Sequence, residues 1–94
     1  LIRTLDIVVT IRIDRELENF QSTVEQEVAE VIRNHFLLDN TDFGRPFIST
    51  ELSREIFRLP NVRYSTVDNL PEVTEVDFNE IIQLNNFTIN TVLI

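Results

Sequence analysis

The sequence LDIVVTIRI at residues 5–13 decides the fold. Its apolar side chains recur at every second position, so in an extended strand they share one face. These inward positions are Leu5, Ile7, Val9, Ile11 and Ile13. The residues between them, which form a mixed second face, are Asp6, Val8, Thr10 and Arg12. Since one strand cannot bury such a stripe alone, the rest of the chain is expected to pair with it and cover it.

Composition limits the classes of protein to consider. The chain has 94 residues, enough for one domain, and its 43% hydrophobic content is typical of a globular protein. The formal net charge is −8, and all eight basic residues are arginine. This charge argues against a nucleic-acid binder and against an anionic membrane surface as partner. Without cysteine, the chain has no disulfide framework and no thiolate chemistry.

The ends of the sequence suggest a piece of a longer polypeptide. It begins with Leu1 rather than methionine, and it has no signal peptide and no apolar run long enough for a membrane span. We therefore expect residues 1–94 to form a single α+β domain, the C-terminal fragment of a longer chain.

Two helices are expected after the first strand. Apolar residues at three- and four-residue steps predict a helix that starts between residues 17 and 22 and ends near residue 38. They are Phe20, Val24, Val28, Val31 or Ile32, and Phe36. Ser22 and Glu25 have the spacing of a capping box. Ser49 or Thr50 is expected to cap a shorter helix that Pro60 stops. Its apolar stripe consists of Leu52, Ile56 and Leu59.

The loop between these helices contains the one glycine of the chain. Gly44 is expected to supply a positive φ angle or a close backbone approach. Phe43 and Phe47 flank it and are expected to hold the loop against the core.

The second half of the chain is predicted to complete an antiparallel sheet. Residues 62–68 alternate as a strand, and residues 69–77 are irregular. Two apolar runs, residues 80–84 and 87–94, flank Asn85-Asn86 and predict a β-hairpin. The predicted order is β-α-α-β-β-β, an α+β fold with a mostly antiparallel sheet and two helices packed on one face.

Residues that could carry chemistry do not form a convincing constellation. His35 is the only histidine, and it lies near the end of the first helix, where it can interact with the terminal carbonyls. Asp39, Asn40, Asp42 and Gly44 match an EF-hand loop poorly, because Phe43 occupies a ligand position. The acidic side chains Glu72, Glu75, Asp77 and Glu80 are better explained as a solvated loop than as an acid-base pair. We expect no catalytic residue, no metal and no cofactor.

The whole pattern resembles the C-terminal domain of the baseplate J-like family of contractile-tail phages, which includes the baseplate wedge proteins of T-even-like phages. The likeness rests on core and turn positions. They are the alternating strand at 5–13, His35-Phe36 at the end of a helix, FGRPF at 43–47, the helix from Ser49 to Leu59, LPNVRY at 59–64 and IIQLNNFTI at 81–89.

The resemblance implies a structural role. Such a domain would be a non-enzymatic connector in the virion tail baseplate, assembled in the host cytoplasm, whose partners are itself, as a homodimer or ring contact, and other wedge proteins. No nucleic acid, membrane or small molecule is implied.

Three successive apolar residues close the chain and place apolar groups on both faces of a strand. The expected interface residues are Asp6, Val8, Thr10, Arg12, Val92, Leu93 and Ile94.

Two other functions stay open at this point. The chain could be an adaptor domain of a cytoplasmic complex unrelated to phage, which the neighbouring genes would distinguish. It could also be a small enzyme that uses its acidic residues, which would require two of the four carboxylates at 72–80 to lie in one concave pocket.

Overall fold

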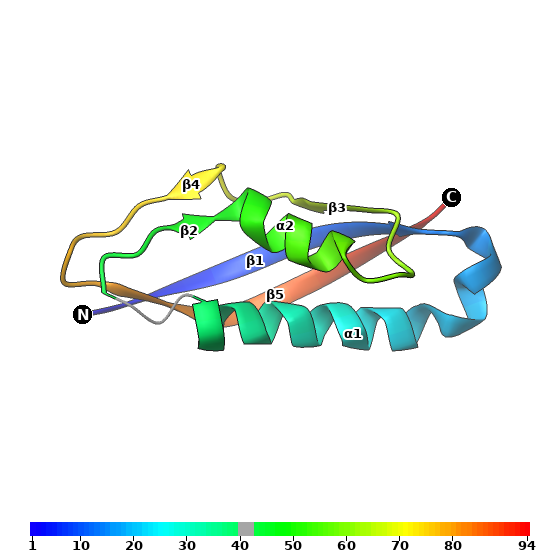
Figure 1. Cartoon of the computed structure of the whole chain (residues 1–94), viewed down its shortest axis with the longest axis horizontal. Coiled ribbons are helices and arrows are strands. Elements are labelled where there is room, and N and C mark those ends of the chain that lie inside the picture. Colours follow the sequence, from blue (N-terminus) through cyan, green and yellow to red (C-terminus); the bar gives the residue numbers. More distant parts are fainter. Residues whose placement is uncertain (40–42) are drawn as a thin grey trace.

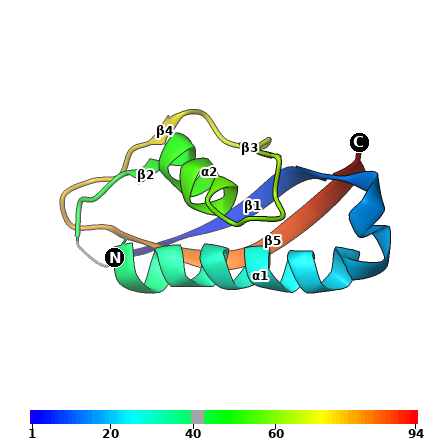
Figure 2. The ribbon, with the colours of Figure 1, turned by 45° about the vertical axis from the view of Figure 1, so that its right-hand side comes forward.

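The computed structural model describes residues 1–39 and 43–94, which form an elongated body with principal extents of 46 × 20 × 19 Å (Figure 1). A three-stranded sheet has the order β3-β1-β5, and a small second sheet pairs β2 with β4. The strands are β1 (Ile2–Ile13), β2 (Phe47–Ile48), β3 (Tyr64–Val67), β4 (Val73–Thr74) and β5 (Ile81–Leu93). The helices α1 (Gln21–Asn34) and α2 (Ser49–Phe57) run in opposite directions (Figure 2).

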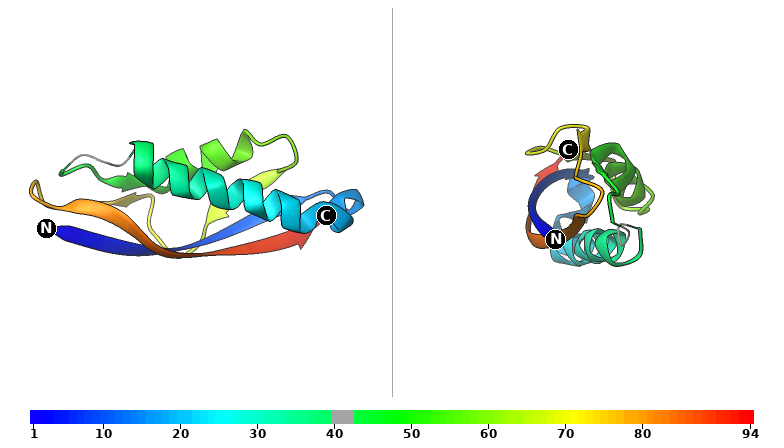
Figure 3. Two further views of the ribbon diagram at one scale, coloured as in Figure 1. Left: turned by 90° about the horizontal axis from the view of Figure 1, so that it is seen from below. Right: turned by 90° about the vertical axis from the view of Figure 1, so that its left-hand side faces the viewer.

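The stripe on β1 forms the centre of the core, as predicted. Leu5 is 8% exposed, and the other four inward side chains are at most 1% exposed. Both helices lie on this face of the sheet (Figure 3). Their expected contacts to the stripe are confirmed, because the following residues belong to the same buried cluster: Val24, Val28, Ile32, Leu52 and Ile56. The α+β class and the position of both helices on one face are therefore confirmed.

The predicted closing hairpin is wrong. Residues 81–93 form one strand, β5, which runs parallel to β1 along its whole length. The sheet is consequently mixed rather than mostly antiparallel, since only β3 pairs with β1 in the antiparallel sense. A two-residue hairpin turn needs positive φ angles. Among the described residues, no residue other than glycine has one.

A β-bulge explains why the sequence of β5 reads as two apolar runs. The register with β1 shifts between Leu5 and Asp6, where Leu5 is opposite Leu84 but Asp6 is opposite Asn86. Asn85 is therefore the extra residue of a bulge, which is unusual in a parallel pair. The extra residue moves the inward side chains from even to odd positions. They are Ile82 and Leu84 before the bulge, and Phe87, Ile89, Thr91 and Leu93 after it.

Asp6 holds the bulge in place. Its Oδ1 atom accepts hydrogen bonds from Asn85 Nδ2 at 2.9 Å and from the backbone N–H of Asn86 at 3.2 Å. The carboxylate thus supplies the acceptor that the irregular register removes from the β1 backbone.

The helix ends differ in detail from the prediction. A 3₁₀ turn at Arg15–Phe20 precedes α1, and one turn of π-helix at His35–Asp39 follows it. The expected capping box is wrong, because Phe20 occupies the N-cap position and no side chain caps it. Glu25 instead accepts a hydrogen bond from Thr91 Oγ1 of β5 at 2.7 Å. The expected serine cap of α2 is also wrong, because Ser49 Oγ donates to the carbonyl of Pro71 at 2.7 Å.

Gly44 has the backbone conformation that the sequence suggested. Its φ angle is +73°, and a Cβ atom placed on it would lie 3.1 Å from Cα of Phe78. Its N–H donates to the carbonyl of Glu80 at 2.8 Å, which joins the loop to the start of β5. Of the two flanking phenylalanines, Phe47 is fully buried as expected, but Phe43 is 65% exposed and does not hold the loop.

Replacing Gly44 with alanine tests both constraints. We expect the Gly44→Ala variant to lose about 1–3 kcal/mol of unfolding free energy, because a side chain there is strained and meets the backbone of Phe78. Urea unfolding at equilibrium measures the loss. Arg45→Ala, a change at an exposed neighbouring position, is the matched control and should be nearly neutral. Equal losses in the two variants would contradict the prediction.

Candidate interaction surface

The side of the sheet opposite the helices carries no other described element (Figure 3). We call it the outer face. The register of β3, β1 and β5 places their outward side chains in rows across it. The outer face consists of Asp6, Val8, Thr10, Arg12, Tyr64, Thr66, Asn86, Thr88, Asn90 and Val92. It is mostly uncharged, with one acid and one base among these side chains.

One row of the outer face combines an aromatic ring, a cation and an apolar side chain. Arg12 lies opposite Tyr64 on one side and opposite Val92 on the other. The Arg12 guanidinium lies 5.8 Å from the centre of the Tyr64 ring, within the range of a cation–π contact. Tyr64 is 53% exposed and Val92 is 42% exposed. Tyrosine and arginine are both enriched at the energetic centres of protein interfaces.

Hydrogen bonds fix the middle of the outer face. The carboxylate of Asp68 accepts hydrogen bonds from the hydroxyls of Thr10 and Thr66, which lie opposite each other on β1 and β3. Next to it, Asn69 continues the pairing of β1 beyond the end of β3. Its side chain accepts from the N–H of Val8 at 2.9 Å and donates to the carbonyl of Asp6 at 2.8 Å. These bonds limit the conformations that the face can adopt in the free protein.

The seven residues predicted from the sequence do not all share this face. Asp6, Val8, Thr10, Arg12 and Val92 lie together on it. Leu93, by contrast, turns inward and packs against the core, so its side chain is not available for an outer-face contact. Ile94 follows the end of β5, where its backbone bonds Ile13 and Arg15 and its side chain is 55% exposed.

The remaining residues of the outer face were not named from the sequence. Tyr64 and Thr66 could have been found, because the alternation at 62–68 places them on one side of a strand. Asn86, Thr88 and Asn90 were missed because the predicted hairpin gave that segment a different neighbour. Their place became evident only from the parallel register with β1.

The polar residues that could serve catalysis have other surroundings. His35 is 3% exposed, and its Nδ1 lies 3.0 Å from Oε2 of Glu55, so the pair joins the end of α1 to α2. The rings of Phe36 and Phe47 contact His35 edge-on. This environment fits a buried packing residue better than a proton-transfer group open to substrate.

The acidic residues do not gather into a buried pair. The side chains of Glu72, Glu75 and Asp77 are exposed, while Glu80 is partly buried and accepts a hydrogen bond from the N–H of Asp77 at 2.9 Å. Of the weak calcium pattern, Asn40 and Asp42 lie outside the described residues. Within residues 1–39 and 43–94, no group of three histidine, cysteine or acidic side chains could hold a metal ion.

One ion pair lies near the end of β1. Asp14 Oδ2 accepts hydrogen bonds from Arg63 Nε at 3.2 Å and Nη2 at 3.0 Å. This hydrogen bonding and the opposite charge raise the pKa of Arg63 above its usual value. The contact is exposed and fixes the turn before β3 rather than forming a reactive group.

No family model matches the sequence, and no curated protein matches it. Among the helices within residues 1–39 and 43–94, none is long and apolar enough to cross a membrane.

Proposed function

We propose that this chain is a structural connector domain of a phage tail baseplate wedge protein, and that it joins subunits through the outer face. The single observation that carries this proposal is the row of Arg12, Tyr64 and Val92. It lies on the outer face, while both helices cover the opposite face of the sheet. The sequence resemblance to baseplate J-like proteins supports the same role. The partners are a second copy or neighbouring wedge subunits, and the location is the virion baseplate, after assembly in the host cytoplasm.

The composition of the outer face is favourable for a protein contact. Valine and threonine are stiff at χ1, so little side-chain entropy is lost when a partner covers them. The hydrogen bonds to Asp68 and Asn69 already order the middle of the surface. A stable interface needs about 800 Å² from each partner, so contacts at the rim of the sheet would have to contribute as well. Protein contacts of this kind require no catalytic group and no cofactor.

Charge reversal on the outer face tests the proposal. We expect the wild-type chain to associate with itself or with a co-expressed tail protein in sedimentation velocity, and Arg12→Glu to weaken that association at least about tenfold. The reversal removes the contact with Tyr64 and places a further acid on a face that already carries Asp6 and the carboxylate of Asp68.

Arg58→Glu is the matched control, because it makes the same charge change at an exposed position on the end of α2. It should leave association unchanged. The proposal fails if the wild-type chain stays monomeric and binds no tail protein, or if the Arg12 and Arg58 variants behave alike.

A further inference from the structure

Strand β5 is an edge of the sheet. Among the described strands it pairs with β1 only. The N–H of Ile81 donates to the carbonyl of Leu1, and the alternation of a strand then turns the backbone groups of Ile82 and Leu84 to the other side. Those groups face away from the sheet, where a further strand could bond them.

Before the bulge at Asn85, this edge lacks the features that normally prevent such pairing. Proteins protect exposed edges with charged residues, proline or irregular backbone. Residues 81–94 contain no charged residue, no proline and no glycine, although 26% of the whole chain is charged. The first part of β5 therefore offers an uninterrupted and neutral edge.

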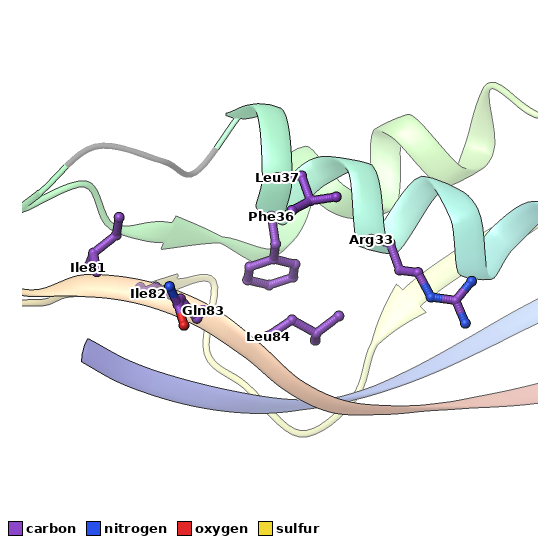
Figure 4. A pocket seen from close by; sticks show the side chains of 7 residues that line it. All are labelled: Arg33, Phe36, Leu37, Ile81, Ile82, Gln83 and Leu84. Atoms are coloured by element: carbon purple, nitrogen blue, oxygen red, sulfur yellow. The ribbon is translucent and has the colours of Figure 1, made fainter.

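A groove of about 460 Å³ follows this edge between β5 and the end of α1 (Figure 4). Four consecutive residues of β5, 81–84, line it, so it runs along the strand edge rather than over one face of the sheet. Its other wall consists of Arg33, Phe36 and Leu37. Leu37 is 68% exposed, which leaves an apolar side chain beside backbone groups that can accept a strand.

Arg33 gives the groove a charge preference. Its guanidinium lies 5.3 Å from the centre of the Phe87 ring, just beyond the lined part of β5. Among the described residues, no acidic side chain lines the groove, although the chain has 16 acidic residues. A carboxylate placed there would meet a cation in partly apolar surroundings, where the attraction is stronger than in open water.

We propose that the groove binds an extended segment of another polypeptide, which adds a strand to residues 81–84 of β5. Alternate apolar side chains of that segment fill the space beside Phe36 and Leu37, and an acidic side chain two residues further on pairs with Arg33. Backbone bonds supply the affinity, and the alternate pockets supply the specificity. This binding mode does not depend on the outer face, which lies on different residues.

A pair of short synthetic peptides tests the proposal on the intact chain. One has valine at two alternate positions and glutamate two residues later, with threonine elsewhere, and the other has lysine in place of glutamate. Fluorescence anisotropy measures affinity, and hydrogen exchange measures protection of the amides of Ile82 and Leu84. We expect the glutamate peptide to bind at roughly millimolar concentration or below and to slow exchange at both amides.

Two variants separate the contributions of the groove. Leu37→Glu places a charge in the apolar wall and should abolish binding, while Phe78→Glu, at an 88% exposed phenylalanine outside the groove, should not change it. Arg33→Glu should weaken the glutamate peptide about fivefold and reverse the preference between the two peptides. Because the reversal compares two ligands on one folded variant, loss of stability cannot mimic it.

Several outcomes would overturn the proposal. They are the absence of binding by both peptides, equal binding by the Leu37 and Phe78 variants, and an unchanged peptide preference in Arg33→Glu. If the amides of Ile82 and Leu84 become protected with rising protein concentration and no peptide, the occupant is a second copy, and the proposed partner is wrong. Arg12→Glu should leave peptide binding intact, so this test and that of the outer face fail independently.

Discussion

Phe47→Ala is expected to lower the free energy of unfolding by about 4 kcal/mol, because it truncates the largest of the fully buried side chains in the described part of the chain. The Phe47 ring stacks on Phe36 with the centroids 5.3 Å apart. His35 contacts the same ring edge-on at 5.7 Å. Alanine would leave a cavity in the buried core beside His35 and Phe36, and both rings would lose contacts.

A small domain has a total stability of about 5–15 kcal/mol, so such a loss should bring the variant close to unfolding near room temperature. Equilibrium urea unfolding monitored by circular dichroism measures it. Phe43→Ala is the control, since it makes the same chemical change four residues earlier, at a side chain that is 65% exposed. We expect the control to lose less than about 0.5 kcal/mol. Similar losses in both variants would show that the loop packs differently.

Removal of Thr88 is expected to cost about 3 kcal/mol or more, whereas removal of Asn85 should cost about 1 kcal/mol or less. Both residues lie in β5, and a deletion shifts every later side chain by one position. The two deletions differ because Asn85 is the extra residue of the bulge. Without it, Leu84, Asn86 and Phe87 alternate as in a regular strand.

Deletion of Thr88 does not restore a regular alternation in this way. Ile89 and Leu93 would move to the outer face unless the bulge were lost in compensation. That compensation would turn Asn86 into the core and Phe87 out of it, which exposes an aromatic ring and buries an amide without a partner. Either arrangement removes part of the contact between β5 and the core.

Thermal and urea unfolding of the two deletion variants, with hydrogen exchange at Ile89 as a local measure, would compare them. If the Asn85 deletion is as harmful as the Thr88 deletion, the bulge is not the reason for the register of β5. A hairpin at Asn85-Asn86 makes the opposite prediction, since it would lose a turn residue and should not tolerate the Asn85 deletion.

The elements whose structure depends on residues close by in the chain could be predicted from local sequence patterns. The stripe of β1 needs only the alternation of residues 5–13, and the two helices follow from their own apolar periodicity. Gly44 was also predictable, because only a glycine readily adopts its φ angle of +73°. Each of these features is set by residues within a few positions of it.

Strand β5 could not be predicted in this way, because its irregularity depends on a distant residue. Asp6 binds Asn85 and Asn86 across separations of 79 and 80 residues. Seen locally, the pair Asn85-Asn86 interrupts the alternation and resembles a turn. Seen next to β1, it is a bulge whose polar groups are satisfied from the neighbouring strand. For the same reason, the local sequence did not show that Asn86, Thr88 and Asn90 of β5 belong to the outer face.

The parallel pairing of β1 and β5 also has a mechanical consequence. The strands pair at twelve positions, and Leu1 and Ile94 lie at opposite ends of the long axis (Figure 1). A pulling force on these two residues would drive the strands past each other in opposite directions. The backbone hydrogen bonds of the pair would then bear the load together, in shear, instead of opening one after another as in an unzipping hairpin. The parallel pair is therefore expected to resist tension along the long axis of the domain.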